Sequence, residues 1–165
     1  MNTGQTLLAV GAMILLSVLI LRVNGTFLTT GTTIMNTKFD ILATSIATSQ
    51  MEEISRKRFD EYTVTTPATK VNQLSAVLGP DNGEKNPPND DTLYDDIDDF
   101  NGYWVNISDM PSAVFHVYCR VNYVTPNALN DSTSTRTWFK KVTVQVSSKS
   151  MTDTVTISTI FSYWQ

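Results

Sequence analysis

The chain has 165 residues, of which 41% are hydrophobic and 17% are charged, and its formal net charge at pH 7 is −4. This length favours one domain preceded by a short hydrophobic arm. The negative charge argues against a nucleic-acid-binding surface, and the single cysteine, Cys119, excludes a disulfide within the chain.

The first element is an uncharged apolar run from Leu7 to Leu21, with Gly11 and Ser17 as its weak points. No basic residue precedes the run and no small-residue cleavage site follows it, so we expect it to be retained rather than removed as a secretory signal. The run is slightly shorter than the roughly 20 residues of a free-standing membrane helix, but residues 5–6 and Val23 extend it. We therefore predict a helix that enters a membrane.

The next segment, residues 24–33, has two glycines and five threonines, all weak helix formers. We group residues 1–33 as a hydrophobic helix with a weak end, and predict a helix break at Gly25 and Gly31. Helical spacing then resumes over residues 34–62, where an apolar stripe predicts an amphipathic helix. The stripe consists of Phe39, Leu42, Ala43, Ile46, Ala47, Met51 and Ile54. Two interpretations remain: an anchor, a linker and a separate helix, or one long helix with a yielding centre.

Residues 63–101 are predicted to form a loop region, because Gly, Pro, Asn and Asp are dense there. Residues 102–165 contain four segments with strand-like composition or period-2 alternation, at 102–108, 113–124, 138–148 and 153–164. Turns are expected at 125–134 and 148–151. The predicted fold class is α+β, with a long N-terminal hydrophobic helix and a C-terminal antiparallel sheet that the amphipathic helix covers.

An acidic cluster lies in the loop region, and oxygen-rich loops of this kind bind Ca²⁺. The end of the cluster partly matches a calcium-binding loop, because Asp99 and Asn101 precede Gly102, although Ile97 stands at the first ligand position. A solvated acidic turn is the alternative. The candidate metal ligands are Asp95, Asp96, Asp98 and Asp99.

Catalytic motifs are absent from the sequence: it has no GxSxG, HExxH or CxxC pattern and no phosphate-binding glycine loop. The single histidine, His116, and Cys119 are three residues apart on one predicted strand, which places them on opposite faces. We expect Cys119 in the core, His116 on the surface, and no enzyme activity.

Several segments together resemble the type IV pilins and the pseudopilins of type II secretion: the leader ending in Gly4, the run QTLLAVGAMILLSVLIL, the acidic segment YDDIDDFNGY and the ending DTVTISTIFSYW. The resemblance implies that a membrane peptidase cuts after Gly4 and that Gln5 becomes the N-terminus. It also implies a helix that melts near Gly25 in the filament. The family usually has a glutamate five residues after the cut, where this chain has Ala9.

The resemblance implies a structural subunit of a filament, held in the inner membrane before assembly and then in an extracellular or periplasmic filament. Its partners would be copies of itself or related pilins. Close helix approach at small residues would then matter, because helices that exchange lipid for protein gain little hydrophobic energy. The alternative is a monomeric, membrane-anchored, extracytoplasmic binding domain. The expected filament-core residues are Leu7, Leu8, Ala9, Gly11, Ala12, Leu15, Leu16 and Leu19.

Overall fold

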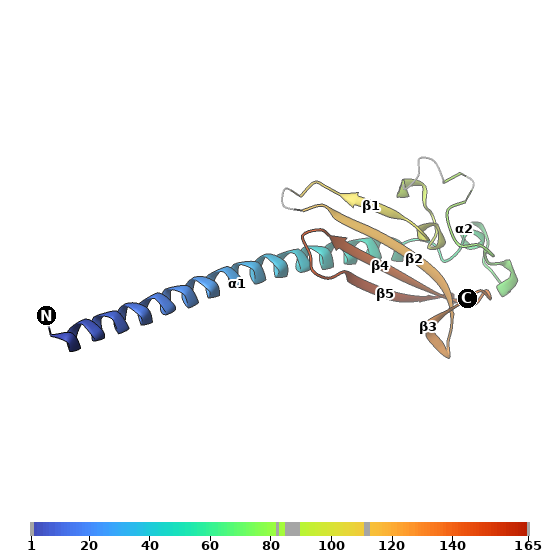
Figure 1. Ribbon diagram of the computed structural model, residues 1–165. Coiled ribbons are helices and arrows are strands. Elements are labelled where there is room, and N and C mark those ends of the chain that lie inside the picture. Colours follow the sequence, from blue (N-terminus) through green and yellow to red (C-terminus); the bar gives the residue numbers. More distant parts are fainter. Residues whose placement is uncertain (1, 82, 85–89, 111–112, 165) are drawn as a thin grey trace. The chain divides into compact units, whose positions relative to one another are not determined.

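A computed structural model describes residues 2–81, 83–84, 90–110 and 113–164. The chain divides into two units, Met1–Phe39 and Asp40–Gln165, each of which is described by itself. One helix, α1 (Thr3–Ser55), begins in the first unit and ends in the second (Figure 1). It continues through Gly25 and Gly31, so the predicted break does not interrupt the helix in this state, and the single long helix is the interpretation that fits.

The second unit is built on an antiparallel sheet in the order β1-β2-β4-β5, which confirms the α+β class (Figure 1). The central pair is β2 with β4, in a register that places Cys119 opposite Val144. β1 and β5 form the flanks of this path. The strands are β1 (Trp104–Ile107), β2 (Phe115–Thr125), β3 (Ala128–Thr133), β4 (Phe139–Ser148) and β5 (Val155–Ser162).

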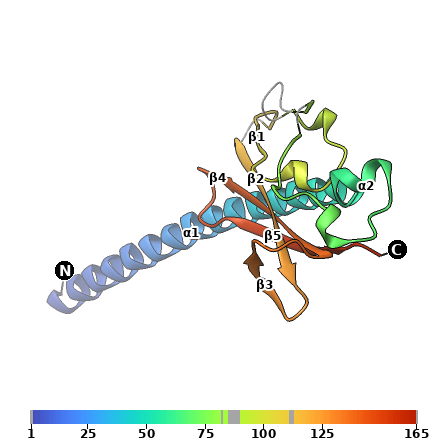
Figure 2. The ribbon, with the colours of Figure 1, turned by 90° about the vertical axis from the view of Figure 1, so that its right-hand side faces the viewer.

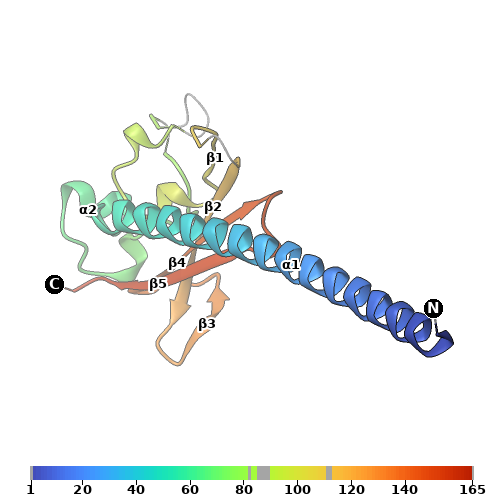
Figure 3. The ribbon, with the colours of Figure 1, turned by 90° about the vertical axis from the view of Figure 1, so that its left-hand side faces the viewer.

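One face of the sheet is buried, as its period-2 pattern predicts. The inward residues of β2 and β4 are almost fully enclosed: Phe115, Val117, Cys119, Val121, Tyr123, Val142, Val144 and Val146. Residues 40–55 of α1 lie across this face (Figure 3), with Ala43, Ala47 and Ile54 fully buried. A helix with one apolar stripe and a sheet with one apolar face thus cover each other, as expected for two packed layers.

The helix ends at Ser55, seven residues before the predicted end at Tyr62. The chain then turns away because Arg58 pairs with the acidic segment: its N–H donates to the Asp95 carbonyl at 3.0 Å, and its carbonyl accepts from the N–H of Ile97 at 2.9 Å. A new short helix, α2 (Glu61–Thr65), begins after Asp60, whose side chain caps it. The charged residues after Ser55 therefore form a junction rather than more helix.

The loop region is more buried than its composition suggests. Its described residues contain three single-turn 3₁₀ helices, η1 (Val71–Gln73), η2 (Asp91–Leu93) and η3 (Asp98–Phe100). The rings of Tyr94, Phe100 and Tyr103 meet edge to face with centroids 5.0–5.9 Å apart. These aromatic contacts fold the loop into the core.

The strand β3 was not predicted and lies in the segment expected to be a turn. It pairs with the end of β2, where Tyr123 faces Thr133 (Figure 2). Four of its six residues are polar and most are exposed, so the sequence has no alternating apolar face to mark them as a strand. The pairing rather than the side chains defines this element.

Candidate functional site

The most unusual surface of the chain is the apolar part of α1 in the first unit. Every described residue from Asn2 to Lys38 is exposed. The large apolar side chains between Leu7 and Val23 retain 46–78% of their accessible surface. This helix is long and apolar enough to cross a membrane. Continuous apolar exposure on this scale requires lipid or protein to cover it, because soluble monomers rarely present such patches.

The predicted processing and core positions all lie on this exposed helix. Gly4 and Gln5 are in its first turn, where the N–H of Gln5 donates to the Asn2 carbonyl at 2.9 Å. At Gly11, a methyl group in place of the hydrogen would meet no atom within 4 Å. The expected core residues are accessible to a partner: Leu7, Leu8, Ala9, Gly11, Ala12, Leu15, Leu16 and Leu19.

Most threonine hydroxyls in the centre of α1 donate to carbonyls of the same helix. Thr26 donates to the Arg22 carbonyl at 3.0 Å, and Thr29 donates to the Gly25 carbonyl at 3.0 Å. Thr33 and Thr37 repeat this bond four residues back. Such bonds allow polar hydroxyls to sit in an apolar environment, and they also compete for the carbonyls of the helix. Residues 24–33 are therefore helical, but their threonine hydroxyls compete with backbone N–H groups for the carbonyl oxygens of the helix.

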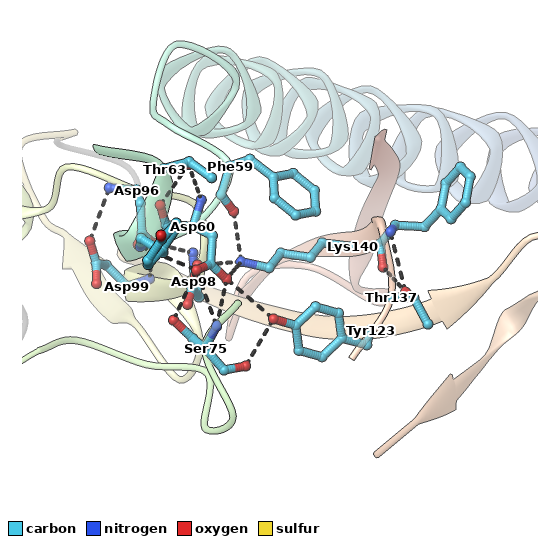
Figure 4. Close-up of polar contacts among 12 residues, drawn as sticks. Phe59, Asp60, Thr63, Ser75, Asp96, Asp98, Asp99, Tyr123, Thr137 and Lys140 are labelled. Atoms are coloured by element: carbon cyan, nitrogen blue, oxygen red, sulfur yellow. Dashed lines mark hydrogen bonds and ion pairs between the residues drawn. The ribbon is translucent and has the colours of Figure 1, made fainter. Parts of the chain in front are cut away.

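The second unit contains a buried charged cluster that the sequence did not reveal. The Lys140 ammonium is fully enclosed and reaches Asp60 Oδ2 at 2.8 Å, Asp98 Oδ1 at 2.5 Å and the Phe59 carbonyl at 2.6 Å (Figure 4). The ammonium also lies 4.6 Å from the centre of the Phe59 ring. These are the two ion pairs found between side chains of the described residues. The cluster ties β4 to the start of α2 and to the acidic segment.

Asp60 is the centre of this cluster. Besides Lys140, its carboxylate accepts from the backbone N–H of Ser75 at 3.0 Å and from the N–H of Tyr62 at 3.3 Å. The Tyr123 hydroxyl lies 3.2 Å from Asp60 Oδ2, and burial raises the pKa of that phenol, so it remains a donor (Figure 4). Both oxygens of a buried charge are thus paired, as burial of an ion requires.

The position of Lys140 in the alternating pattern of β4 indicates that its side chain is buried, which was not predicted from the sequence. Strand β4 places even-numbered residues inward, and Lys140 has the same parity as Val142, Val144 and Val146. A lysine on the apolar face of a strand needs a carboxylate partner in the core. The identity of that partner was not readable, because Asp60 and Asp98 are 80 and 42 residues away in sequence.

The acidic segment is folded inward, so the solvated-turn alternative is wrong for three of the four candidate ligands. Asp96, Asp98 and Asp99 are 1–2% exposed, whereas Asp95 is exposed. Asp98 is committed to Lys140, and Asp99 Oδ2 accepts from the N–H groups of Asp95 and Asp96, both at 3.1 Å. Gly102 makes the turn after η3 at φ 86°, a conformation that favours glycine.

Burial perturbs the protonation of this segment. Burial first, and then the neighbouring Asp98 carboxylate, raise the pKa of Asp96 to about 10. Burial also raises the pKa of Asp99 to about 7, although the backbone N–H groups that it accepts oppose the shift. The cost of keeping these groups charged in a poorly solvated place is the physical cause.

The cysteine and histidine lie as expected on opposite faces of β2. Cys119 is fully buried, and burial raises the pKa of its thiol to about 12, which makes it unreactive near neutral pH. His116 is exposed, with Nδ1 2.5 Å from the Asn106 side-chain oxygen on β1. The two side chains therefore do not form a nucleophile–base pair.

An open pocket lies where β4 and β5 meet the C-terminal residues. The rings of Trp138 and Tyr163 stack there with centroids 5.5 Å apart, and the volume is about 340 Å³. It is lined by Thr69, Trp138, Phe139, Ser162, Tyr163 and Trp164. Such a hollow offers aromatic faces and hydroxyl groups to a small ligand.

Comparisons with protein-family models, with curated proteins and with solved structures gave no match.

Proposed function

We propose that the chain is a structural subunit of a filament similar to type IV pili or pseudopili. The proposal rests on one observation: the same chain contains an exposed apolar helix, residues 3–38, and a folded α+β unit. The helix needs a covering that the described residues of its own unit do not provide. Lipid would cover it before assembly, in the inner membrane, and neighbouring subunits would cover it in an extracellular or periplasmic filament.

Assembly would be non-covalent and would occur through the N-terminal helices of copies of this chain or of related pilins. Because lipid tails are as apolar as leucine, exchange of lipid for protein is driven by close packing rather than by burial alone. Small residues allow that approach: Ala9, Gly11 and Ala12 fall within one turn, and Gly11 has open space around it. The larger residues around them, such as Leu8 and Leu16, would fill the spaces between helices.

The centre of the helix would adapt during assembly. Gly25 and Gly31 each lower helix stability by about 1 kcal/mol relative to alanine. The threonine hydroxyls also compete with backbone N–H groups for the carbonyl oxygens of the helix. Melting of residues 24–33 in the filament would let neighbouring folded units adjust their spacing. Processing after Gly4 would expose Gln5 as the terminus, with Ala9 in place of the usual carboxylate.

A test compares bulky substitutions in two places in cells that produce the chain. Gly11→Phe and Ala12→Phe should abolish filaments, seen by electron microscopy of sheared surface material, because the ring blocks helix approach. Ala76→Phe, at an exposed loop position of the second unit, is the matched control and should leave filaments intact. Mass spectrometry of the wild-type filaments should find this chain. Normal filaments from both helix variants would overturn the proposal.

The alternative, a monomeric anchored binding domain, is favoured by one observation, the aromatic pocket beside Trp138 and Tyr163. A monomer would stay in the membrane fraction as single subunits, and its surface material would contain no filaments of this chain. In that case Trp138→Ala should abolish ligand binding without changing membrane retention. The same microscopy therefore separates the two functions.

A further inference from the structure

The face of the sheet opposite its buried side is polar, and it is hollowed where β2, β3 and β4 meet. The hollow has a volume of about 280 Å³, and all of its lining residues come from these three strands. Val124 belongs to this outer face by its parity with Arg120, yet it is only 1% exposed, so other parts of the chain cover this end of the sheet. The register of β2 with β3 shifts between Val124 and Thr125 (Figure 2), and such irregularities bend a strand. The hollow is therefore built by the fold of the hairpin.

Two cations in this hollow have no carboxylate partner among the described residues. Arg120 on β2 and Lys141 on β4 both line it, and they are diagonal neighbours in the register of the two strands. The two ion pairs found between described side chains both belong to Lys140. The Lys141 ammonium donates instead to a neutral amide, Asn130 Oδ1, at 3.3 Å. Both charges are thus available to a ligand.

The charge of this face is opposite in sign to the charge of the whole chain. The chain has a net charge of −4, but β1, β2, β4 and β5 contain no aspartate or glutamate. The one acid of β3, Asp131, alternates with Asn130 and Ser132, which line the hollow, so alternation places it on the other side of that strand. A positive hollow on an acidic protein attracts an anionic ligand.

The groups around the two cations suit a ring that carries hydroxyl groups. The amides of Asn122 and Gln145 and the hydroxyl of Thr143 line the hollow, and each can both donate and accept. Tyr118 also lines it, and Trp104 lies directly opposite Tyr118 on β1. These two aromatic side chains are 43% and 51% exposed. Their flat apolar faces are available to the C–H groups of a sugar ring.

We propose that this hollow binds an acidic saccharide, that is, a sugar ring that carries one carboxylate. The carboxylate lies between the Arg120 guanidinium and the Lys141 ammonium, both of which form charge-assisted hydrogen bonds with such groups. The amides and hydroxyls bind the ring hydroxyls, and Tyr118 packs against the ring. The volume is slightly below the roughly 300–1,000 Å³ of pockets for drug-sized ligands, which fits one sugar unit, free or within a chain. The site does not depend on the filament proposal, because all of its residues belong to the second unit.

The test titrates the isotopically labelled full chain, in neutral detergent micelles, with sodium D-glucuronate, and sodium chloride of equal concentration is the control. Nuclear magnetic resonance should show saturable shifts of the amide signals around Arg120 and Lys141, with a Kd on the order of 1 mM. D-glucose should bind about 10-fold more weakly, because it leaves both cations without a partner. Inorganic phosphate should also bind more weakly, because it leaves the amides and the aromatic ring unused.

Two further ligands identify the source of the sugar and the class of the partner. Tighter binding of oligogalacturonate than of glucuronate would assign the site to a unit within a polysaccharide, and the reverse order would assign it to a free sugar acid. The proposal would be overturned by the absence of saturable shifts with both, by equal binding of glucose and glucuronate, or by equal binding of phosphate and glucuronate. Tighter binding of a short oligothymidylate than of either saccharide would also overturn it, in favour of a nucleic acid.

Variants on the outer face test the two cations without changing the core. Arg120→Gln and Lys141→Gln should each weaken glucuronate binding by about 10-fold, because each removes one charged donor. Lys149→Gln, at an exposed cation outside the hollow, is the matched control and should bind as the wild type does. Tyr118→Ala should weaken the binding of glucuronate and glucose alike. Unchanged glucuronate binding in both cation variants, with the Tm of the wild type as proof of folding, would contradict the assignment.

Discussion

The two halves of the molecule depart from the usual distribution of polarity in opposite ways. In residues 3–38, leucine, isoleucine and valine side chains are outside, and in the second unit a lysine and four aspartates are inside. The buried charges of Lys140, Asp60 and Asp98 are paired within the chain. The exposed apolar side chains are not covered by the described residues of their own unit, so lipid or another protein has to cover them. The paired buried charges stabilise one fold of the second unit, whereas the exposed apolar side chains indicate that the helix associates with lipid or with another protein.

The largest expected effect comes from breaking the buried pairing. Lys140→Met should lower the free energy of unfolding by about 3–5 kcal/mol, because two enclosed carboxylates lose their counterion. Chemical denaturation of the full chain in micelles, followed by tryptophan fluorescence, measures it. Lys141→Met on the outer face of β4 is the control and should change stability by less than about 0.5 kcal/mol. Equal effects of the two variants would show that the cluster does not stabilise the fold.

The next effect contrasts a buried and an exposed isoleucine of the same helix. Ile54 is fully buried and Ile41 is 65% exposed. Ile54→Ala should cost about 2–4 kcal/mol through lost burial and a cavity, and Ile41→Ala should cost little in micelles. The same denaturation experiment measures both. A large loss of stability with Ile41→Ala would mean that Ile41 packs within a single copy of the chain, which would contradict its exposure of 65%.

The stability of the second unit should also depend on pH in a defined direction. The raised pKa of Asp96, about 10, means that the folded state holds a proton there that the unfolded state releases near pH 4. Stability should therefore fall as pH rises from 5 to 8. Asp96 contributes up to about 1.4 kcal/mol per pH unit, and Asp99, whose pKa is raised to about 7, adds to the slope in the lower part of this range. Denaturation in the presence of a chelator measures the slope.

Two variants isolate the source of that slope. Asp96→Asn should reduce it and leave only the part due to Asp99 below about pH 7, because the amide cannot ionise and can still donate a hydrogen bond. Asp109→Asn, at an exposed position, should keep the wild-type slope. If stability instead rises with pH in the wild type, Asp96 is charged in the folded state and the account of its burial is wrong.

The smallest effect concerns the centre of the exposed helix. A methyl group at Gly25 or Gly31 meets no atom within 4 Å. Gly25→Ala and Gly31→Ala should each stabilise the helix by about 1 kcal/mol and slow amide exchange there about fivefold. Hydrogen exchange of the chain in micelles measures it, with Gly4→Ala in the first turn as the control. Unchanged exchange would mean that the glycines are not a weak point.

The sequence predicted those parts of the fold that periodicity encodes. Alternation located the inward residues of β2 and β4, and the helical stripe located Ala43, Ala47 and Ile54, because burial of one face repeats along an element. β3 was not predicted because most of its residues are polar and exposed, and its pairing with β2 defines it as a strand. The end of α1 escaped because Arg58 leaves the helix to pair with a distant segment.

The candidate sites were predictable to different degrees. The apolar helix is local, so composition alone revealed it. The charged cluster combines Asp60, Asp98 and Lys140 across 80 residues, and no local pattern joins them. The acidic segment was visible, but which aspartates turn inward depends on Lys140 and on the backbone bonds around η3.

An electron cryo-microscopy reconstruction of sheared surface material from cells that produce this chain tests the filament proposal directly. We expect a filament whose centre holds the N-terminal helices, with Gly11 and Ala12 at contacts between copies and the sheets of the second unit outside. Residues 24–33 should be melted in part. Filaments that lack this chain, or helices that face solvent instead of one another, would contradict it.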